Sequence, residues 1–570
     1  MVSLNQLFYG DNLSILRDYV ADESVDLVYL DPPFNSNANY NILFRSPTGA
    51  AADGQIEAFE DTWRYGTEAA NAYHEVIRSG RSDIAELLRS MQCFVGQNDM
   101  MAYLSMMAVR LIELHRVLKP TGSLYLHCDP TASHYLKLLL DGLFGPRNFR
   151  SEISWRRSFA HNDARQGRAQ YGNIRDTILF YTKGNEWTWN WQYTAYDHSY
   201  ADSAYRHIDP EGRCYRRGDL TAAKPGGDVS YGWPVKRMVG GGWEADIDAE
   251  FETPKDGWEY RQVPPYKGRF WAFSRANMTR FAREGRLVYT SSGMPEYKRY
   301  LDEQLGVPLQ NDWDDLPSVS GRERLGYPTQ KPIALLERIV AASSNPGDVV
   351  LDPFCGCGTA VHAAQKLGRH WVGIDITYLS IGLIQRRLME AFPDINFNII
   401  GEPSGLDDAR HLAAVEPYQF QYWITQKIGG QPYRGGRKGA DRGIDGYIYY
   451  TRNAVGAGRA GTAAAIISVK TGRNVGVAMV RDLCGVLERE KADIGIFVSV
   501  AAPSRDMARE AAAAGIWTDP ITNESYPRIQ ILTLDDVFAG RIPKLPLLDR
   551  QAGYRRAPRE AGARQQPSLF

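Results

Sequence analysis

Two short segments of this chain each combine an apolar strand, an acid that ends it and a turn, and they lie far apart in the sequence. The first is Val25 to Leu30 followed by Asp31-Pro32-Pro33-Phe34, and the second is Asp348 to Leu351 followed by Asp352-Pro353-Phe354-Cys355-Gly356-Cys357-Gly358-Thr359. Open α/β sheets carry functional groups at the carboxyl ends of such strands. The sequence therefore predicts an α/β sheet in which both strand ends meet in one cleft.

The surrounding pattern places helices and strands around these two segments. Apolar spacing predicts helices over about 13–19, 100–118, 333–342 and 359–367, the last ended by Gly368, and strands over 7–9, 123–127 and 370–374. Between them, residues 155–325 are rich in Trp, Tyr, Gly and Arg without sustained periodicity, which predicts a separate, loop-rich unit. A break near 401–408 precedes a last unit over 412–545, and residues 546–570 are predicted to be a disordered tail.

Size and composition limit the class of protein. The chain of 570 residues is too long for one hydrophobic core, and its 44% hydrophobic and 23% charged residues are typical of globular proteins. No apolar run of about 18 residues or secretion signal is recognisable, so a cytoplasmic protein without a membrane span is expected. Six cysteines without regular spacing fit a reducing compartment, and Cys355 and Cys357 are interpreted as small residues beside glycines rather than metal ligands.

The glycine-rich turn has the features of a nucleoside-binding loop. Gly356 and Gly358 let backbone approach a ligand closely, and Thr359 is expected to cap the following helix. Asp375 ends the next strand 23 residues after Asp352, a spacing suited to an acid that accepts hydrogen bonds from ribose hydroxyls. A third glycine and a phosphate-binding lysine are missing, which favours an adenosyl group without phosphates.

The segment Asp31-Pro32-Pro33-Phe34 suits chemistry on an exocyclic base amine, whose lone pair is delocalised into the ring. Asp31 and the carbonyl of Pro32, fixed by the adjacent Pro33, would accept the two N–H bonds and restore electron density on nitrogen. Phe34 would stack on a base rotated out of the duplex. This chemistry needs no metal. Taken alone, the tetrapeptide is also compatible with an ordinary turn that ends a strand.

With both motifs in this order, residues 1 to about 400 resemble the β-type amino-DNA methyltransferases, above all the modification subunits of type III restriction systems. The resemblance also rests on Tyr327-Pro328-Thr329-Gln330-Lys331-Pro332. It implies a circularly permuted Rossmann-like fold, with the catalytic part in 1–154, a target-recognition region in 155–325 and the cofactor-binding part in 326–400.

The resemblance also implies roles for single residues. S-adenosylmethionine would contact Asp352, Phe354, Gly356 and Gly358, with Asp375 on its ribose, Lys331 and Pro332 at its methionine end, and Asp11 near its adenine. The family uses Asp in the first position of the catalytic motif mainly for N6 of adenine and Ser more often for N4 of cytosine. Asp31 therefore favours adenine, and cytosine remains the alternative.

The expected partner is double-stranded DNA, although the formal net charge is only −1. Basic residues are concentrated between Arg147 and Arg175, a stretch that contains seven arginines and only two acidic residues. Arg156, Arg157, Arg165 and Arg168 are the predicted DNA contacts. Two further partners are compatible with the sequence: a second copy of the chain in a homodimer and a separate restriction subunit. Two other functions are also compatible with it, namely a DNA-binding protein with an inert methyltransferase half and a methyltransferase that acts on protein glutamine or RNA.

In the last unit, 412–545, the sequence predicts strands over 441–448 and 465–470, a helix over 477–490 and a strand over 494–500. This order resembles the nuclease domain of Mrr-type restriction endonucleases, an α/β fold. Asp445 and Lys470 match the family pattern, but Ser468 stands where the family has an acid or amide, and Gln421 where an upstream glutamate is frequent. Ser and Gln bind Mg²⁺ weakly, so an accessory domain that holds DNA or is a vestigial nuclease is favoured. A single-chain restriction-modification enzyme that uses Mg²⁺ to cut DNA is the alternative.

Overall fold

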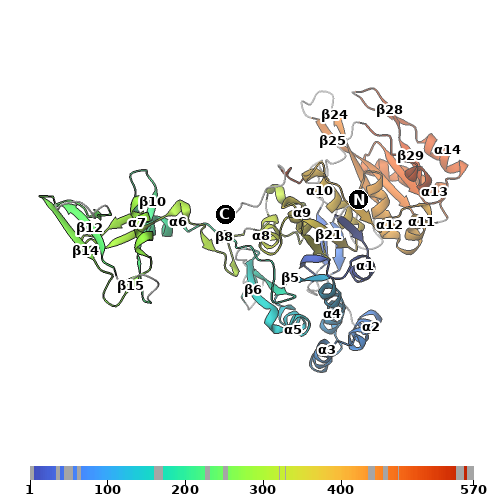
Figure 1. Cartoon of the computed structure of the whole chain (residues 1–570). Coiled ribbons are helices and arrows are strands. Elements are labelled where there is room, and N and C mark those ends of the chain that lie inside the picture. The colour runs from blue at the N-terminus through green and yellow to red at the C-terminus, as the bar shows by residue number, and fades with distance from the viewer. Residues whose placement is uncertain are drawn as a thin grey trace. The chain divides into compact units, whose positions relative to one another are not determined.

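The computed structural model covers the chain in two compact units, residues 1–190 with 310–570 and residues 191–309 (Figure 1). It describes residues 5–33, 39–43, 55–60, 66–158, 171–224, 231–247, 255–316, 318–319, 321–327, 329–433, 443–453, 460–472, 474–520, 522–546 and 557–560. For 39–43, 55–60, 322, 451–453 and 460–462 only the backbone is described. No helix among the described residues is long and apolar enough to span a bilayer.

A nine-stranded sheet forms the centre of the first unit, in the order β19-β6-β7-β5-β2-β20-β21-β1-β22. Neighbouring strands from β5 through β22 are parallel, whereas β7 is antiparallel to both β5 and β6. The strands are β1 (Gln6–Tyr9), β2 (Val25–Leu30), β5 (Leu118–Cys128), β6 (Phe149–Arg156), β7 (Arg175–Thr182), β19 (Asp312–Trp313), β20 (Val349–Asp352), β21 (His370–Asp375) and β22 (Asn398–Ile400).

The sheet interleaves early and late parts of the chain. The late strands β20 and β21 lie side by side between the early strands β2 and β1. Leu27 and Val28 of β2 pair with Val350 and Leu351 of β20. The ends of the two motif-bearing strands are therefore neighbours, as the sequence predicts.

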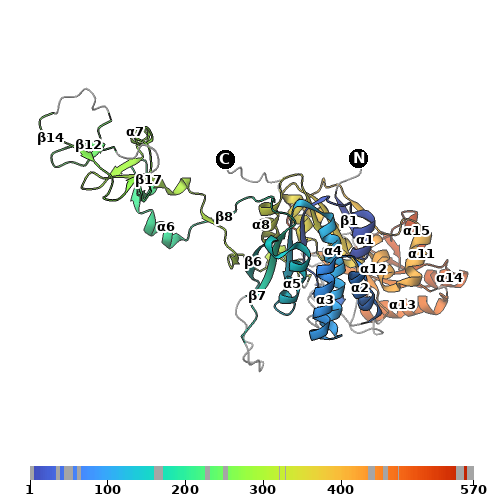
Figure 2. The ribbon, with the colours of Figure 1, turned by 60° about the horizontal axis from the view of Figure 1, so that its bottom comes forward.

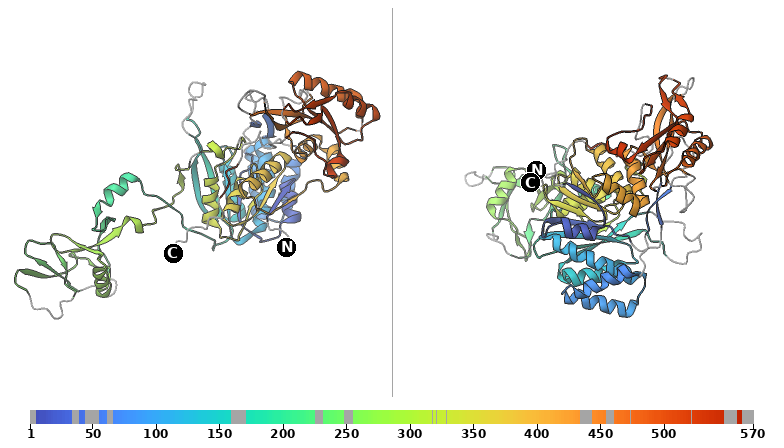
Figure 3. Two further views of the ribbon diagram at one scale, coloured as in Figure 1. Left: turned by 90° about the horizontal axis from the view of Figure 1, so that it is seen from above. Right: turned by 90° about the vertical axis from the view of Figure 1, so that its right-hand side faces the viewer.

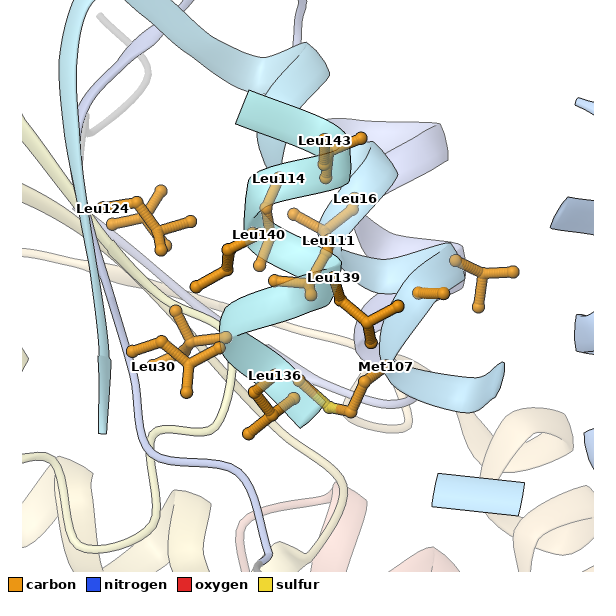
Figure 4. Packing of buried hydrophobic residues seen from close by; sticks show 14 of the residues in the cluster. Leu16, Leu30, Met107, Leu111, Leu114, Leu124, Leu136, Leu139, Leu140 and Leu143 are labelled. Carbon is orange, nitrogen blue, oxygen red and sulfur yellow. The ribbon is translucent and has the colours of Figure 1, made fainter. Parts of the chain in front are cut away.

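One face of the sheet is covered by helices of the N-terminal part, which appear together in Figure 2. Helices α1 (Asn12–Tyr19), α4 (Asp99–Val117) and α5 (Ser133–Phe144) lie next to the strands, and α2 (Thr67–Arg78) and α3 (Ser82–Val95) pack on α4 and α5 farther from the sheet. Because strand side chains alternate between faces, Val28 and Leu30 of β2 and Leu124 and Leu126 of β5 all point into this layer. Figure 4 shows leucines of α1, α4, α5, β2 and β5 converging in this core.

The opposite face is covered by α8 (Ile333–Ser343), α9 (Thr359–Lys366) and α10 (Tyr378–Ala391), drawn in yellow in Figure 3. Tyr125 of β5 points to this side, where its hydroxyl hydrogen-bonds Ser343 Oγ of α8 at 2.7 Å. The prediction that α9 ends at Gly368 is confirmed, because Gly368 has a φ of +73° and donates to Gln365 O.

The second unit has its own small core although its strands are short. Its sheets have the orders β16-β17-β10-β9, β13-β12-β14, β11-β15 and β18-β8. Buried Trp233, Trp271 and Met278 lie in one cluster of this unit. The elements are β8 (Tyr193–Thr194), α6 (His198–Ala204), β9 (His207–Ile208), β10 (Cys214–Gly218), β11 (Thr221–Ala222), β12 (Trp233–Met238), β13 (Glu244–Ala245), β14 (Trp258–Val263), β15 (Phe270–Trp271), α7 (Arg275–Arg283), β16 (Leu287–Tyr289), β17 (Pro295–Tyr300) and β18 (Val307–Pro308).

This unit is narrower than the region 155–325 set apart on sequence grounds. Strands β6, β7 and β19, which overlap or fall within 155–325, belong to the nine-stranded sheet. Trp155 and Trp313 pair with each other in register there. The aromatic and arginine-rich composition of the region hid these three strands.

Residues from 401 onward build a five-stranded sheet, β23-β24-β25-β26-β29, with helices around it. The elements are α11 (Leu406–Val415), α12 (Pro417–Lys427), β23 (Gln431–Pro432), β24 (Gly446–Asn453), β25 (Ala460–Lys470), α13 (Val477–Glu490), β26 (Gly495–Ser499), α14 (Arg505–Ala513), β27 (Ile516–Thr518), β28 (Ser525–Pro527), β29 (Ile529–Thr533) and α15 (Leu534–Phe538). The predicted strand, helix and strand over 465–500 are confirmed. The predicted disordered tail, 546–570, includes four described residues, 557–560, of which Ala557 and Glu560 hydrogen-bond to α10.

The remaining elements are the hairpin β3 (Asn39–Leu43) and β4 (Gln55–Glu60) and the short 3-10 turns Pro146–Asn148, Leu301–Glu303 and Gly321–Glu323.

Candidate active site

A cavity of about 270 Å³ lies where the carboxyl ends of β1, β2, β20 and β21 meet. Asp31 follows β2, Gly356 belongs to the turn after β20, and both line this cavity. The predicted residues Asp11, Lys331, Asp352, Phe354, Thr359, Asp375 and Pro33 line it as well. Of the predicted set, Pro32, Pro332 and Gly358 are described but do not line it, and Phe34 lies outside the described residues.

Hydrogen bonds to two acids fix the backbone of the glycine-rich turn. Asp352 Oδ1 accepts from Phe354 N at 3.0 Å, and Asp375 Oδ2 accepts from Gly356 N at 2.9 Å. The other oxygen of Asp375 accepts from the backbone and hydroxyl of Thr377 at 2.9 and 3.0 Å. The turn is therefore held against the end of β21, with its backbone facing the cavity.

Both glycines of the turn have backbone conformations that side chains disfavour. Gly356 has a φ of +53° and Gly358 a φ of +75°, and a Cβ on Gly358 would lie 2.9 Å from Ile384 Cγ1. The prediction that Thr359 caps α9 is wrong, because Gly358 occupies the N-cap position and Thr359 is the first helical residue. The Thr359 hydroxyl instead donates to Lys331 O at 3.3 Å.

Burial changes the acid–base behaviour of the two loop-holding acids. Burial, together with the neighbouring charges of Asp31 and Asp375, raises the pKa of Asp352 well above its usual range. Burial also raises the pKa of Asp375, against the opposing effect of its hydrogen bonds. A positively charged ligand in the cavity would offset this cost by favouring the carboxylates.

Arg110 of α4 anchors the end of β1 and was not predicted from the sequence. Its guanidinium donates to Asp11 Oδ1 and Asn12 Oδ1, both at 2.6 Å. Asn12 in turn donates to Pro353 O of the glycine-rich turn at 2.8 Å. A signal for this contact exists, since an arginine inside the apolar run 107–112 must have a buried partner.

Asp31 and Lys331 form an ion pair at the end of the cavity that lies beside β2. The Nζ of Lys331 contacts Asp31 Oδ2, and the two side chains are 10% and 17% exposed. The other basic residue among the described cavity residues, Arg110, is also paired with an acid. A ligand with phosphate groups would therefore compete with existing ion pairs, whereas a cationic ligand can pair with Asp352 and Asp375, which also line the cavity.

A second cavity, of about 370 Å³, shares Tyr327, Thr329 and Lys331 with the first. Its other lining residues are Trp155, Arg157, Asp176, Ser318, Val319, Arg324 and Gln330. Trp155 is 3% exposed, and its Nε1 has no hydrogen-bond partner among the described residues. A buried donor beside a cavity is satisfied when a ligand with an acceptor enters.

Buried polar side chains connect the two cavities. The Tyr29 hydroxyl, in the first cavity, lies 3.0 Å from His127 Nδ1, and His127 Nε2 lies 3.1 Å from Asp176 Oδ2 in the second. Burial alone would raise the pKa of Asp176, but the hydrogen bond from His127 and the charges of His127, Lys331 and Arg157 lower it overall. Asp176 is therefore a carboxylate at neutral pH.

The predicted DNA contacts divide into two groups. Arg156 donates to Asp314 O at 2.8 Å, and Arg157 pairs with Asp176 at 3.2 Å on the edge of the second cavity. Arg165 and Arg168 lie outside the described residues. Arg150, in the same basic stretch, stacks on Trp187 at 3.8 Å within the protein.

The nuclease-like residues of the C-terminal part also lie together. Asp445, 4% exposed, accepts from Val469 N at 2.7 Å, and Lys470 Nζ lies 4.0 Å from the same carboxylate. Gln421 donates to the other oxygen of Asp445, and Ser468 is buried on the same strand as Lys470. Among the described residues, no group of three or more His, Cys, Asp or Glu side chains is placed to hold a metal.

Comparison with known proteins gives two family matches. Residues 412–518 match the model of the Mrr catalytic domain, a restriction endonuclease. Residues 25–381, more than half of the chain, match the DNA methylase model of N6 and N4 methyltransferases.

Three curated relatives have similar lengths of match. The type II methyltransferase M.EcaI of Enterobacter cloacae is 27% identical over 386 residues, 67% of this chain and 69% of that protein. The Mod subunit of the type III restriction-modification enzyme StyLTI of Salmonella typhimurium is 26% identical over 381 residues, 64% of this chain and 50% of that subunit. The DNA adenine methyltransferase YhdJ of Escherichia coli is 26% identical over 387 residues, 67% of this chain and 82% of that enzyme. The chain therefore belongs to the DNA methylase family of N6 and N4 methyltransferases, with an Mrr-type endonuclease domain after the methylase region.

Proposed function

We propose that the chain is a site-specific DNA methyltransferase that transfers a methyl group from S-adenosylmethionine to N6 of adenine in duplex DNA. The observation that carries the proposal is that Asp31 and the glycine-rich turn line one cavity. Lys331 links them, because its side chain pairs with Asp31 while its carbonyl accepts from Thr359.

The cavity residues fit S-adenosylmethionine. Asp352 and Asp375 supply acceptors for ammonium and hydroxyl groups, and Gly356, which lines the cavity and has no Cβ, lets a ligand approach the backbone closely. Asp11, held by Arg110, would approach the adenine, with Phe354 against the adenosyl group and Lys331 and Pro332 towards the methionine end. The chemistry that this cofactor supplies when bound is an electrophilic methyl group on a sulfonium.

The chain's own residues would activate and aim the amine. Lys331 holds Oδ2 of Asp31, so Oδ1 can accept an N–H of the target amine, and the carbonyl of Pro32 accepts the other. Both contacts would strengthen as the nitrogen becomes positive during direct attack, which lowers the barrier. Phe34 would stack on the target base.

The second cavity would receive the base after it is rotated out of the duplex. It adjoins the ion pair of Asp31 and Lys331 through Lys331, and the Nε1–H of Trp155, which has no partner among the described residues, can donate to a ring nitrogen of adenine. Arg156 and Arg157, with Arg165 and Arg168, would contact DNA phosphates nearby, and the unit 191–309 would select the sequence. The relative YhdJ is named as an adenine methyltransferase, which agrees with Asp31 in favouring adenine.

Sequencing of modified bases tests the target. DNA from cells that express the chain is expected to carry N6-methyladenine in one sequence context, and DNA from cells that express Asp31→Ala none. N4-methylcytosine would instead make the chain a cytosine enzyme. Absence of both bases, together with no transfer of labelled methyl groups to unmodified DNA by the purified chain, would contradict the proposal.

For the C-terminal domain we propose a DNA-holding role without cleavage. Both carboxylate oxygens of Asp445 accept hydrogen bonds from the protein, and Gln421 and Ser468 are neutral where the nuclease family uses acids or amides. Divalent cations prefer carboxylate oxygens, so Mg²⁺ capture here would be weak. The alternative, a single-chain restriction-modification enzyme, is favoured by the pairing of Asp445 with Lys470.

Supercoiled plasmid separates these alternatives. The full chain with Mg²⁺ is expected to leave the plasmid supercoiled over hours at excess protein. If nicked or linear plasmid forms and Lys470→Ala does not produce it, the domain is an active nuclease. Cleavage that persists in Lys470→Ala would come from another source. Gel filtration tests whether the chain forms a homodimer, and co-purification tests whether it binds a separate restriction subunit. The similarity to a Mod subunit supports the restriction subunit.

A further inference from the structure

Residues Ala557 to Glu560, here called the C-terminal strap, lie on helices α9 and α10 of the methyltransferase. Ala557 N donates to Glu390 Oε2 and Glu560 N donates to Ala391 O, both at 3.0 Å. The Ala557 side chain, 8% exposed, belongs to a buried cluster that also contains Cys357 of the glycine-rich turn. The strap therefore packs against the back of the cofactor cavity.

Glu560 directs its carboxylate into this buried region. One oxygen lies 3.3 Å from His362 Nε2 and the other 3.1 Å from Lys366 Nζ. The hydrogen bond from His362, together with Lys366, lowers the pKa of Glu560 to about 2, although partial burial opposes the shift. Glu560 is thus a carboxylate that contacts two basic side chains of α9 at once. A single surface ion pair would be weaker evidence that the strap has a fixed position.

The contact continues from His362 to the glycine-rich turn. Arg387 Nε donates to His362 Nδ1 at 3.3 Å, so the proton of the neutral imidazole must lie on Nε2, where it can be donated to Glu560. Burial lowers the pKa of His362 to about 4, which keeps the ring neutral. The arrangement of donors and acceptors is therefore fixed from Glu560 to Arg387.

Arg387 completes the path to the active site. It is 2% exposed, and its Nη1 donates to Cys357 O at 2.9 Å and to Thr359 Oγ1 at 3.0 Å. Thr359 donates to Lys331 O, and Lys331 pairs with Asp31. A buried guanidinium must be held by acceptors in one geometry, because an unpaired donor there is costly. The position of Arg387 thus sets the position of the loop.

We propose that the C-terminal strap is a positioning element of the cofactor site, in which Glu560, acting through His362 and Arg387, holds Cys357 and Thr359 in the arrangement that binds S-adenosylmethionine. This inference rests on the proposed function for the identity of the cofactor. It also gives a role to the segment that follows the nuclease-like domain. Any partner or DNA that displaces the strap would weaken cofactor binding.

Calorimetric titration of the full chain with S-adenosylmethionine tests the proposal. Glu560→Ala is expected to raise the dissociation constant about three- to tenfold, the effect of one charge-assisted hydrogen bond transmitted through the network. In methylation assays KM for the cofactor should rise by a similar factor, while kcat and KM for DNA stay within twofold. Glu560→Gln, which can still accept from His362, should recover part of the affinity. Arg559→Ala, an exposed residue of the same segment, is the matched control and should bind as the wild type does.

Coupling between residues distinguishes this role from general stabilisation. Glu560→Ala should have no further effect on cofactor affinity in a His362→Gln background, because the path is already broken there. Two results would contradict the positioning role of the strap and leave the proposed function intact. One is a double variant whose dissociation constant rises by the product of the two single effects. The other is a wild-type dissociation constant in Glu560→Ala. Failure of the wild-type chain to bind S-adenosylmethionine would overturn both the positioning role and the proposed function.

Discussion

Replacing Asp31 by alanine is expected to lower kcat for methyl transfer by about a hundred- to ten-thousandfold. Under the proposed function, this carboxylate accepts an N–H of the target amine and restores electron density on its nitrogen, and Lys331 holds the other carboxylate oxygen in place. Cofactor binding should change less than threefold, because the glycine-rich turn is held by Asp352, Asp375 and Arg387 rather than by Asp31.

Methyl transfer from labelled S-adenosylmethionine and calorimetric binding measure these two quantities on the same preparation. Asp31→Asn, of equal size but without charge, should lose most of the activity as well. Asp22→Ala is the control, since this acid is 73% exposed and pairs with Arg116 away from the cavity. Wild-type turnover in Asp31→Ala would remove Asp31 from the mechanism.

Gly358→Ala is expected to weaken cofactor binding by about tenfold or more. Two costs combine at this position: the φ of +75° disfavours a side chain, and the new Cβ would lie 2.9 Å from Ile384 Cγ1, on helix α10. Because Ile384 is fully buried, the loop must move rather than the helix. Movement of the loop would displace Cys357 and Thr359 from Arg387.

Gly347→Ala separates backbone strain from loop displacement. Gly347 also has a positive φ, +89°, but a Cβ there meets nothing within 4 Å. This control should lose about 1 kcal/mol of unfolding free energy without a change in cofactor affinity. Equal affinities in Gly358→Ala and the wild type would show that the turn does not approach the cofactor closely.

Much of the central fold could be predicted because its strands and helices are long enough to show the periodic spacing of apolar residues typical of each. Strand β2 (Val25–Leu30) and helix α13 (Val477–Glu490) have the bounds that the sequence predicts. The unit 191–309 could not be resolved into elements, since many of its strands have only two or three residues. An alternation of apolar and polar residues cannot be recognised over so short a run.

The residues of the candidate site that could be predicted are those that directly follow a recognisable strand in the sequence. Asp31, Asp352, Gly356 and Asp375 follow from strand ends alone. Arg110 and the pair of Asp31 with Lys331 depend on packing between distant elements, which periodicity does not describe. The prediction for Thr359 was wrong because Ser and Thr are frequent helix caps. Here Gly358 occupies the N-cap position, and the Thr359 hydroxyl donates to Lys331 O.

The interleaving of β20 and β21 between β2 and β1 has a consequence for synthesis on the ribosome. Strand β2 acquires its neighbour β20 only after residue 352 has emerged, which is after the whole unit 191–309 has been translated. Under the proposed function, a nascent chain cannot transfer methyl groups before it carries the part that selects the sequence. Under that function, unfinished chains would be unable to modify DNA indiscriminately, because the sheet that holds the site is completed late in translation.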